Sequence, residues 1–227
     1  MPAHFSEDLF QYLRSLARNN SREWFLENKA RYEQALRLPA QAFIADFAPK
    51  LQKIAPAYVA DPRPVGGSLF RIHRDTRFSK DKTPYKTHCG IQFRHRHGKD
   101  VHAPGFYLHL EPKRCFVGAG LWHPETKVQR AIREAITEKS EAWKRITRGK
   151  TFQGTWRLEG ESLKRPPRGF DADHPMIEDL KRKDFIAVSD LTAEEACSDD
   201  FLQSFTARCR SAVPFMKLLC EATEMDW

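Results

Sequence analysis

The sequence predicts an α+β fold, with a mainly antiparallel sheet of four to six strands flanked by amino- and carboxy-terminal helices. Apolar residues recur at helical spacing over the first fifty residues and again after residue 124. Short strand-like segments separated by turn residues occupy the middle of the chain. Helices, then a run of strands, then helices form the order typical of α+β proteins.

The amino-terminal part, residues 1–54, is expected to be helical. Ser6 is placed to cap a first helix, and residues 19–21 (Asn-Asn-Ser) interrupt the apolar pattern before a second one. Pro39 stands where the first turn of a third helix tolerates proline, and Pro49 is expected to bend or interrupt that helix. The aromatic stripes of these helices are expected to face the core.

A Pro- and Gly-rich connection leads from these helices into the sheet-rich part, residues 68–161. The turn between the third and fourth expected strands is very short, which predicts an antiparallel hairpin. A helix that opens at residues 123–125 is expected to extend to Trp143. Strands are expected over residues 68–75, 88–96, 105–112, 114–122 and 155–161.

The last part, residues 162–227, is expected to contain a turn-rich loop up to Pro175 and a helix after residues 199–200 that kinks at Pro214. With 227 residues, the chain is expected to be a single α+β domain, residues 1–227. Hydrophobic residues make up 41% of the chain and no apolar run approaches the roughly 20 residues that a membrane helix needs. Disordered and membrane-spanning classes are therefore excluded.

The five cysteines are odd in number and widely spaced, and none forms a Cys-x-x-Cys pair. A disulfide framework or a zinc knuckle is therefore not expected, and reduced thiols in a cytoplasm fit the pattern. The first ten residues lack the features of a secretory signal, which also favours a cytoplasmic location. Phosphate-loop, dinucleotide-binding and nucleophile-elbow motifs are absent, so the sequence indicates no cofactor.

Positive charge is concentrated in one segment. The formal net charge is +8, and nine basic residues against two acidic ones between Arg71 and Lys99 supply +7 of it. A local excess of this size attracts anions. The alternative is a solvated basic face that only aids solubility.

Within this segment, residues 71–86 (RIHRDTRFSKDKTPYK) carry the chemistry. In an extended chain Arg74 would share a face with apolar neighbours, so its charge needs a carboxylate or a bound anion. Arginine forks and lysine point charges are suited to phosphate or carboxylate groups. Asp75 and His73 are candidates for proton transfer. The expected ligand-binding residues are Arg71, Arg74, Arg77, Lys82, Tyr85 and Lys86.

Eight positions of this segment match, without departure, the signature Arg-x-x-Arg-Asp-x-Arg-Phe-x-x-x-Lys-x-Pro-Tyr. The chain thereby resembles domain-of-unknown-function family 2461, bacterial proteins of about this length with relatives in fungi. The resemblance extends over nearly the whole chain, including NNSREWF and PGFYLHLEP. It implies one unit and supplies no catalytic assignment. The matched positions are Arg71, Arg74, Asp75, Arg77, Phe78, Lys82, Pro84 and Tyr85.

Two weaker patterns suggest other sites. His95 and His97 would share a strand face, and His109 on a neighbouring strand is a third candidate ligand for a metal, although ordinary surface histidines are the alternative. Aromatic residues on or beside the sheet next to a basic patch are able to stack nucleic-acid bases, although core packing is the alternative. They are Phe106, Tyr107, Trp122 and Trp156.

Three hypotheses follow. The first is a preformed anion site that binds a phosphate-bearing ligand, either a nucleic acid or a nucleotide. The second is an enzyme that acts on a small phosphorylated or carboxylated substrate, with the arginines holding it and Asp75 or a histidine moving protons. The third is an interaction module in which Arg71, Asp75 and Arg77 form an internal ion-pair network.

Overall fold

A computed structural model describes residues 2–98 and 103–227. Its centre is one five-stranded antiparallel sheet in the order β1-β2-β3-β5-β4. The expected α+β class and the mainly antiparallel sheet are confirmed. The strands are β1 (Cys89–Arg94), β2 (Gly105–Glu111), β3 (Arg114–Leu121), β4 (Arg157–Glu159) and β5 (Phe185–Leu191).

The alternation of side chains along the strands fixes the two faces of the sheet. Ile91 and Phe93 of β1 are buried, whereas Gln92 and Arg94 between them are only partly covered. The expected hairpin of β2 and β3 is confirmed: Glu111 pairs with Arg114 across the two-residue turn. The apolar residues of β1 therefore point to one side, where Phe93 meets Phe47 of the helical layer.

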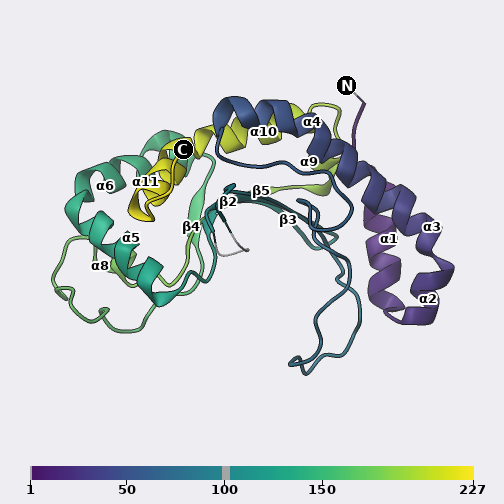
Figure 1. Cartoon of the computed structure of the whole chain (residues 1–227), viewed down its shortest axis with the longest axis horizontal. Coiled ribbons are helices and arrows are strands. Elements are labelled where there is room, and N and C mark those ends of the chain that lie inside the picture. Colours follow the sequence, from purple (N-terminus) through teal and green to yellow (C-terminus); the bar gives the residue numbers. More distant parts are fainter. Residues whose placement is uncertain (1, 99–102) are drawn as a thin grey trace.

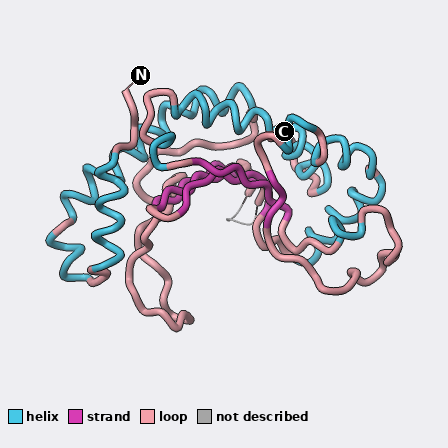
Figure 2. Tube along the Cα trace, turned by 180° about the vertical axis from the view of Figure 1, so that it is seen from behind, coloured by secondary structure: helices cyan, strands magenta, loops and turns pink. Residues whose placement is uncertain are grey.

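Helices cover one face of the arched sheet and both of its ends (Figures 1 and 2). On the convex face lie α4 (Leu38–Ile54) and α10 (Phe201–Ser211). At one end are α1 (Glu7–Arg18), α2 (Arg22–Glu27) and α3 (Lys29–Tyr32), and at the other are α5 (Thr126–Glu138), α6 (Ser140–Thr147), α8 (Ile177–Leu180) and α11 (Val213–Ala222). The short helices α7 (Lys150–Gln153) and α9 (Ala193–Ala196) and a π-helical segment (Glu33–Arg37) complete the described elements.

The core is built from aromatic rings between α4, α10 and the sheet. Phe47 of α4 lies 4.7 Å from Phe93 of β1 and 4.9 Å from Phe205 of α10, measured between ring centroids. Phe43 and Phe201 extend the same cluster at 5.5 Å. Edge-to-face and offset contacts of this kind stabilise a core beyond the area they bury. No described helix combines the length and the apolar character that crossing a bilayer requires.

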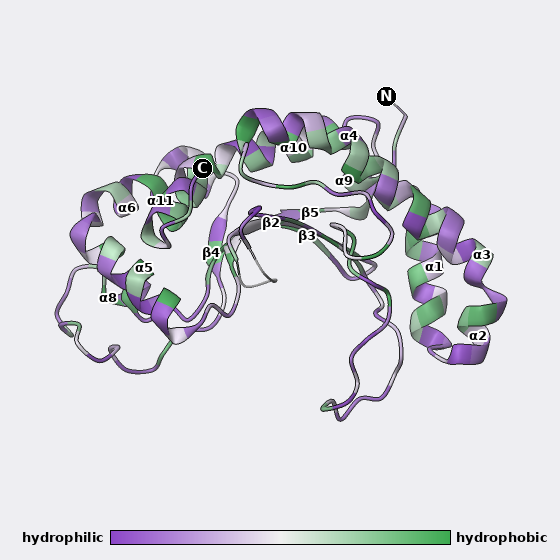
Figure 3. Cartoon of the chain, viewed as in Figure 1, coloured by the Kyte–Doolittle hydropathy of each residue, from purple (hydrophilic) through white to green (hydrophobic). Residues whose placement is uncertain are grey.

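A long loop hangs from the sheet on the side that α4 and α10 leave uncovered (Figure 1). It comprises residues 71–86, called the signature loop below, and it is largely hydrophilic (Figure 3). The expected strand over residues 68–75 is wrong. This segment makes only isolated bridges, Leu69 with Ile91 and His73 with Tyr85, because it leaves the edge of β1 after Phe70 and turns back on itself.

Several helix boundaries differ from the expectation. Pro39 stands in the first turn of α4, as expected, although the π-helical segment joins α3 to α4 directly, and Pro49 lies inside α4 without interrupting it. Lys139 separates α5 from α6, so one long helix to Trp143 is wrong. Pro214 stands in the first turn of α11, where its missing N–H costs nothing, and two helices replace the expected kinked one.

Strand β5 was not predicted, although it occupies an inner position of the sheet between β3 and β4. It begins at Phe185, opposite Leu121, and places its backbone against Gly120. Gly120 has a φ of +127°, and a Cβ there would lie 2.0 Å from the Phe185 carbonyl oxygen. Glycine is thus needed at this position for the close packing of the two backbones.

Candidate functional site

The signature loop is a two-stranded arm with an irregular tip. Antiparallel backbone bonds close its stem: Arg74 N–H donates to the Pro84 oxygen and Lys86 N–H donates to the Ile72 oxygen, each at 2.8 Å. Ile72 is buried at the base of the stem. Residues 75–83 form the tip, which the stem holds away from the sheet (Figure 1).

The amino-terminal helices fix the stem. The side-chain amide of Asn20 clamps Tyr85 from both sides: Asn20 Nδ2 donates to the Tyr85 oxygen at 2.9 Å, and Tyr85 N–H donates to Asn20 Oδ1 at 3.0 Å. The Tyr85 ring stacks on Phe25 of α2 at 4.1 Å and is buried. Tyr85, predicted as a ligand-binding residue, therefore lies in the core contact that orients the arm.

The Arg74 side chain is bound by residues of the signature loop itself. Its guanidinium pairs with Asp81 at 2.5 Å, donates to the Thr83 oxygen at 3.2 Å and also bonds the Thr83 hydroxyl. Asp81 in turn accepts from Thr83 N–H at 2.9 Å, and these contacts lower the pKa of Asp81 to about 2. The carboxylate that Arg74 requires is thus Asp81, seven residues along the chain, rather than Asp75.

Asp75 pairs with Arg77 within the tip. Arg77 donates from Nε at 3.0 Å and from its terminal nitrogen at 2.7 Å, and these bonds lower the pKa of Asp75 to about 2. A carboxyl group with so low a pKa is a poor proton acceptor at neutral pH. His73 is exposed, with its ring 5.2 Å from that of Tyr85. The structure provides no carboxylate partner for His73 within the described residues.

Other cations of the loop have no carboxylate partner among the described residues. The Arg71 guanidinium makes no described hydrogen bond or ion pair, and the same holds for the exposed ammonium of Lys80. Lys82 donates one bond, to the Thr76 oxygen at 2.9 Å, and Lys86 donates to the Arg71 oxygen at 2.9 Å. Four positive charges therefore remain after Arg74 and Arg77 are balanced.

Two features of the tip were not among the predicted binding residues. Phe78 is 95% exposed, and Arg77, whose side chain is 77% exposed, lies over its ring at 5.8 Å. Lys80 adds an exposed charge two residues further on. The signal was present in the sequence: an aromatic residue inside a run of charged and polar residues has no apolar partners at strand or helix spacing.

The structure does not bring the three candidate metal ligands together. His95 and His97 approach one carboxylate, Asp226, at 3.1 and 3.8 Å, and His95 also bonds the Asp226 backbone oxygen at 2.8 Å. His109 pairs in the sheet with Gly90, whereas His95 bridges to Tyr58 beyond the end of β1. The described residues contain no group of three or more ligands suited to a metal ion.

His109 belongs instead to a polar chain on the open face of β2. The Tyr107 hydroxyl lies 3.0 Å from His109 Nδ1, and His109 Nε2 lies 3.3 Å from a Glu111 carboxylate oxygen. His88 stacks on the His109 ring at 4.5 Å, and burial lowers the pKa of His88 to about 4. Alternate residues of one strand share a face, so this arrangement was readable from the sequence and was missed.

Among the aromatic residues considered for base stacking, Phe106 and Trp156 are core residues with 0% and 3% exposure. Trp122 is half exposed, and Tyr107 lies on the open face of the sheet. Lys99, which was counted in the basic segment, lies outside the described residues.

Comparison with known proteins identifies one family. The chain matches the model of the family described as Conserved hypothetical protein (DUF2461) over residues 8–218, which spans the signature loop and all five strands. The description of the family names no activity. Among curated proteins, none matches this chain.

Proposed function

The chain belongs to the DUF2461 family, and we propose that it binds a phosphate-bearing polymer, a nucleic acid, through the signature loop. The observation that carries the proposal is the set of four cations without carboxylate partners among the described residues, on a braced arm that projects from the sheet. These residues are Arg71, Lys80, Lys82 and Lys86. Phosphate groups on a polyanion are the natural partners of such cations.

A polymer suits the arm better than a mononucleotide does. Three cavities of the described chain, at β1, at β4 and at the turn between β2 and β3, have no tip residue in their lining. The cations are spread along a projecting arm, so a small ligand would meet only one or two of them. A nucleic-acid backbone repeats its charge every few ångströms and is able to engage several at once.

Phe78 supplies the second kind of contact that a nucleic-acid interface uses. Its ring is almost fully exposed at the tip, and exposed aromatic rings beside cations stack on unpaired bases. An exposed ring of this size costs solubility and contributes nothing to the core. The arm is therefore suited to single-stranded segments, with cations on the phosphates and Phe78 against a base.

Arg74 and the Asp75–Arg77 pair have a supporting role in this proposal. The two ion pairs hold the tip in one conformation, so the arm loses little conformational freedom when a ligand binds. The internal ion-pair hypothesis is thus combined with the binding hypothesis: some charges of the signature hold the loop and others face solvent. A cytoplasmic location, where nucleic acids are abundant, fits this activity.

Fluorescence anisotropy with a labelled 20-nucleotide single strand tests the proposal. The variant Arg71→Gln/Lys80→Gln/Lys82→Gln is expected to bind roughly 100-fold more weakly at 50 mM salt, since it loses three phosphate contacts. The matched control, Lys164→Gln/Arg165→Gln/Arg168→Gln, removes three exposed charges from another loop and is expected to keep most of the affinity. Equal losses in the two variants would refute a role for the arm.

The second candidate function is that of an enzyme, and one observation favours it. With the His109 proton on Nε2 and donated to Glu111, Nδ1 would accept a hydrogen bond from the Tyr107 hydroxyl, and such a chain is able to move a proton to or from a substrate. Release of nitrophenol from p-nitrophenyl phosphate measures this directly. The enzyme hypothesis predicts turnover that His109→Asn abolishes; turnover that persists in His109→Asn, or none in the wild type, counts against it.

A further inference from the structure

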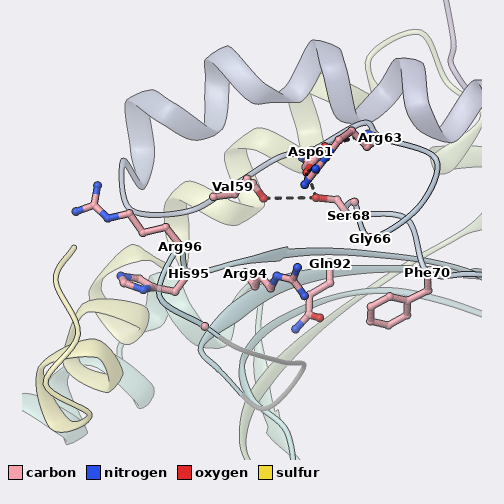
Figure 4. Close-up of a pocket in the computed structure, with 12 residues that line it drawn as sticks. Val59, Asp61, Arg63, Gly66, Ser68, Phe70, Gln92, Arg94, His95 and Arg96 are labelled. Atoms are coloured by element: carbon pink, nitrogen blue, oxygen red, sulfur yellow. Dashed lines mark hydrogen bonds and ion pairs between the residues drawn. The ribbon is translucent and has the colours of Figure 1, made fainter.

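A cavity separate from the signature-loop tip lies beside the edge strand β1 (Figure 4). Two segments pair with this strand: Val59 N–H donates to the Arg94 oxygen at 3.0 Å, and Gln92 N–H donates to the Ser68 oxygen at 2.8 Å. The chain between them, residues 60–67, therefore arches over the strand. The cavity lies between this arch and the side chains of β1, and its volume is about 170 Å³.

Arg94 provides a guanidinium group for this cavity. Its side chain lines the cavity and makes no hydrogen bond or ion pair with any described residue. The side chain is half-buried, so its guanidinium has lost some water without gaining a hydrogen bond among the described residues, although its charge helps to lower the pKa of Asp61. A planar fork of N–H donors in this position is complementary to the oxygens of a phosphate or carboxylate.

The arch supplies further donors. Gly66 and Gly67 line the cavity, and their amide N–H groups donate to no acceptor among the described residues. Gly66 has a φ of +73°, and a Cβ on Gly67 would lie 2.4 Å from the Arg63 oxygen, so both positions favour glycine. Backbone amides that approach a ligand without side chains in the way are a common feature of anion sites.

The charge of the cavity is positive. Its one lining carboxylate, Asp61, is bound by Arg63, which donates from Nε at 2.7 Å, and this pair lowers the pKa of Asp61. Arg96 is balanced by Asp226. Arg94 contributes less than Arg63 to the lowered pKa of Asp61, and it is the one cation of the described lining that no hydrogen bond or ion pair engages.

We propose that this cavity is a binding site for a small oxyanion, inorganic phosphate or a simple carboxylate, with Arg94 as its principal ligand. The volume sets the class of ligand. A volume of about 170 Å³ is well above the roughly 10–15 Å³ that one water needs by the same measure, so one tetrahedral anion fits. Pockets for drug-sized ligands and cofactors typically have about 300–1,000 Å³, so the smaller volume of this cavity favours a small anion over a nucleotide.

Calorimetric titration of inorganic phosphate into the full chain, at fixed ionic strength in chloride, tests the site. Arg94→Gln is expected to weaken phosphate binding at least tenfold, because it removes a charged fork. Arg94→Lys keeps the charge without the fork, so its affinity is expected to lie between the two. Arg165→Gln, the same change at an exposed position elsewhere, is expected to leave binding unaltered. No saturable binding in the wild type, or equal affinities for Arg94→Gln and Arg165→Gln, would overturn the proposal.

Two further measurements complete the test. Titrations with sulfate and acetate distinguish a tetrahedral anion from a carboxylate. If Arg94→Gln does not fold, phosphate-induced amide shifts in the wild type locate the site: shifts at residues 61–68 and 92–96 support the proposal, and shifts confined to residues 75–83 contradict it. The variant Arg71→Gln/Lys80→Gln/Lys82→Gln is expected to keep phosphate binding here, so failure at either site is separable from failure at the other.

Discussion

Replacing Arg74 by alanine separates the bracing role of the signature from its binding role. The substitution removes an ion pair with Asp81 and two hydrogen bonds to Thr83. Hydrogen bonds to charged groups contribute about 1.5–3 kcal/mol each when buried, but exposed ion pairs contribute at most about 1 kcal/mol. The Arg74 side chain is 26% exposed and that of Asp81 is 59% exposed, so we expect a loss of about 1–2 kcal/mol.

The loss of stability in Arg74→Ala is expected to be confined to the tip of the signature loop. Chymotrypsin cleaves after Phe78, which is the exposed aromatic residue of the tip. Because 1.4 kcal/mol is a factor of ten in an equilibrium, the open form of the tip and its cleavage rate are expected to rise about tenfold in Arg74→Ala. Far-ultraviolet circular dichroism of the folded protein is expected to stay unchanged, since no helix or strand rests on Arg74.

Arg71→Ala is the matched control, because Arg71 carries the same side chain three residues earlier and its guanidinium makes no hydrogen bond or ion pair with the described residues. Its cleavage rate is expected to stay within twofold of the wild type, whereas its nucleic-acid affinity falls. If Arg74→Ala resists chymotrypsin as well as Arg71→Ala does, the bracing role assigned to Arg74 is wrong.

Further outcomes follow from other contacts. Asn20→Ala removes both bonds to Tyr85 and is expected to raise chymotrypsin cleavage at Phe78, with helix content unchanged by circular dichroism. Gly120→Ala is expected to destabilise the protein by more than about 2 kcal/mol in urea unfolding, because its Cβ would collide with the β5 backbone. Burial holds the pKa of His88 at about 4, below its ordinary 6.5, so the unfolded chain binds more protons between these values. Stability is therefore expected to fall as the pH drops from 6.5 toward 4, and the urea midpoint of His88→Gln to fall less over that range. We propose that residues 1–227 form a single domain, for which fluorescence and circular dichroism should report coincident urea transitions; two separate transitions would contradict it.

The helices and the β2–β3 hairpin were predictable because the spacing of apolar residues within each segment is that of a helix or of a strand. Ile91 and Phe93 alternate with polar residues, and the turn at residues 112–113 is too short for anything but antiparallel pairing. Strand β5 was missed because it opens with four consecutive apolar residues, 185–188, so the alternation of apolar and polar residues that marks a half-buried strand does not show.

The sequence predicted which segment makes up the candidate site, but not which of its charges pair with one another. The concentration of arginine and lysine in residues 71–86 marked the segment, whereas the partner of Arg74 depends on how the tip turns. The sequence predicted that Arg74 needs a carboxylate or a bound anion, and the turn of the tip brings Asp81 to it. The cavity at Arg94 could not be predicted from the sequence either, because it forms only where residues 60–67 arch over β1 in the folded chain.

The salt dependence of nucleic-acid binding tests the central claim most directly. Each phosphate neutralised on a single strand contributes about −0.7 to the slope of log K against log salt concentration. With four cations engaged, the wild-type slope is expected to be about −3, and removing three of them in Arg71→Gln/Lys80→Gln/Lys82→Gln is expected to bring it to about −1. A wild-type slope near zero, or the same slope in both proteins, would contradict the assignment of phosphate contacts to the signature loop.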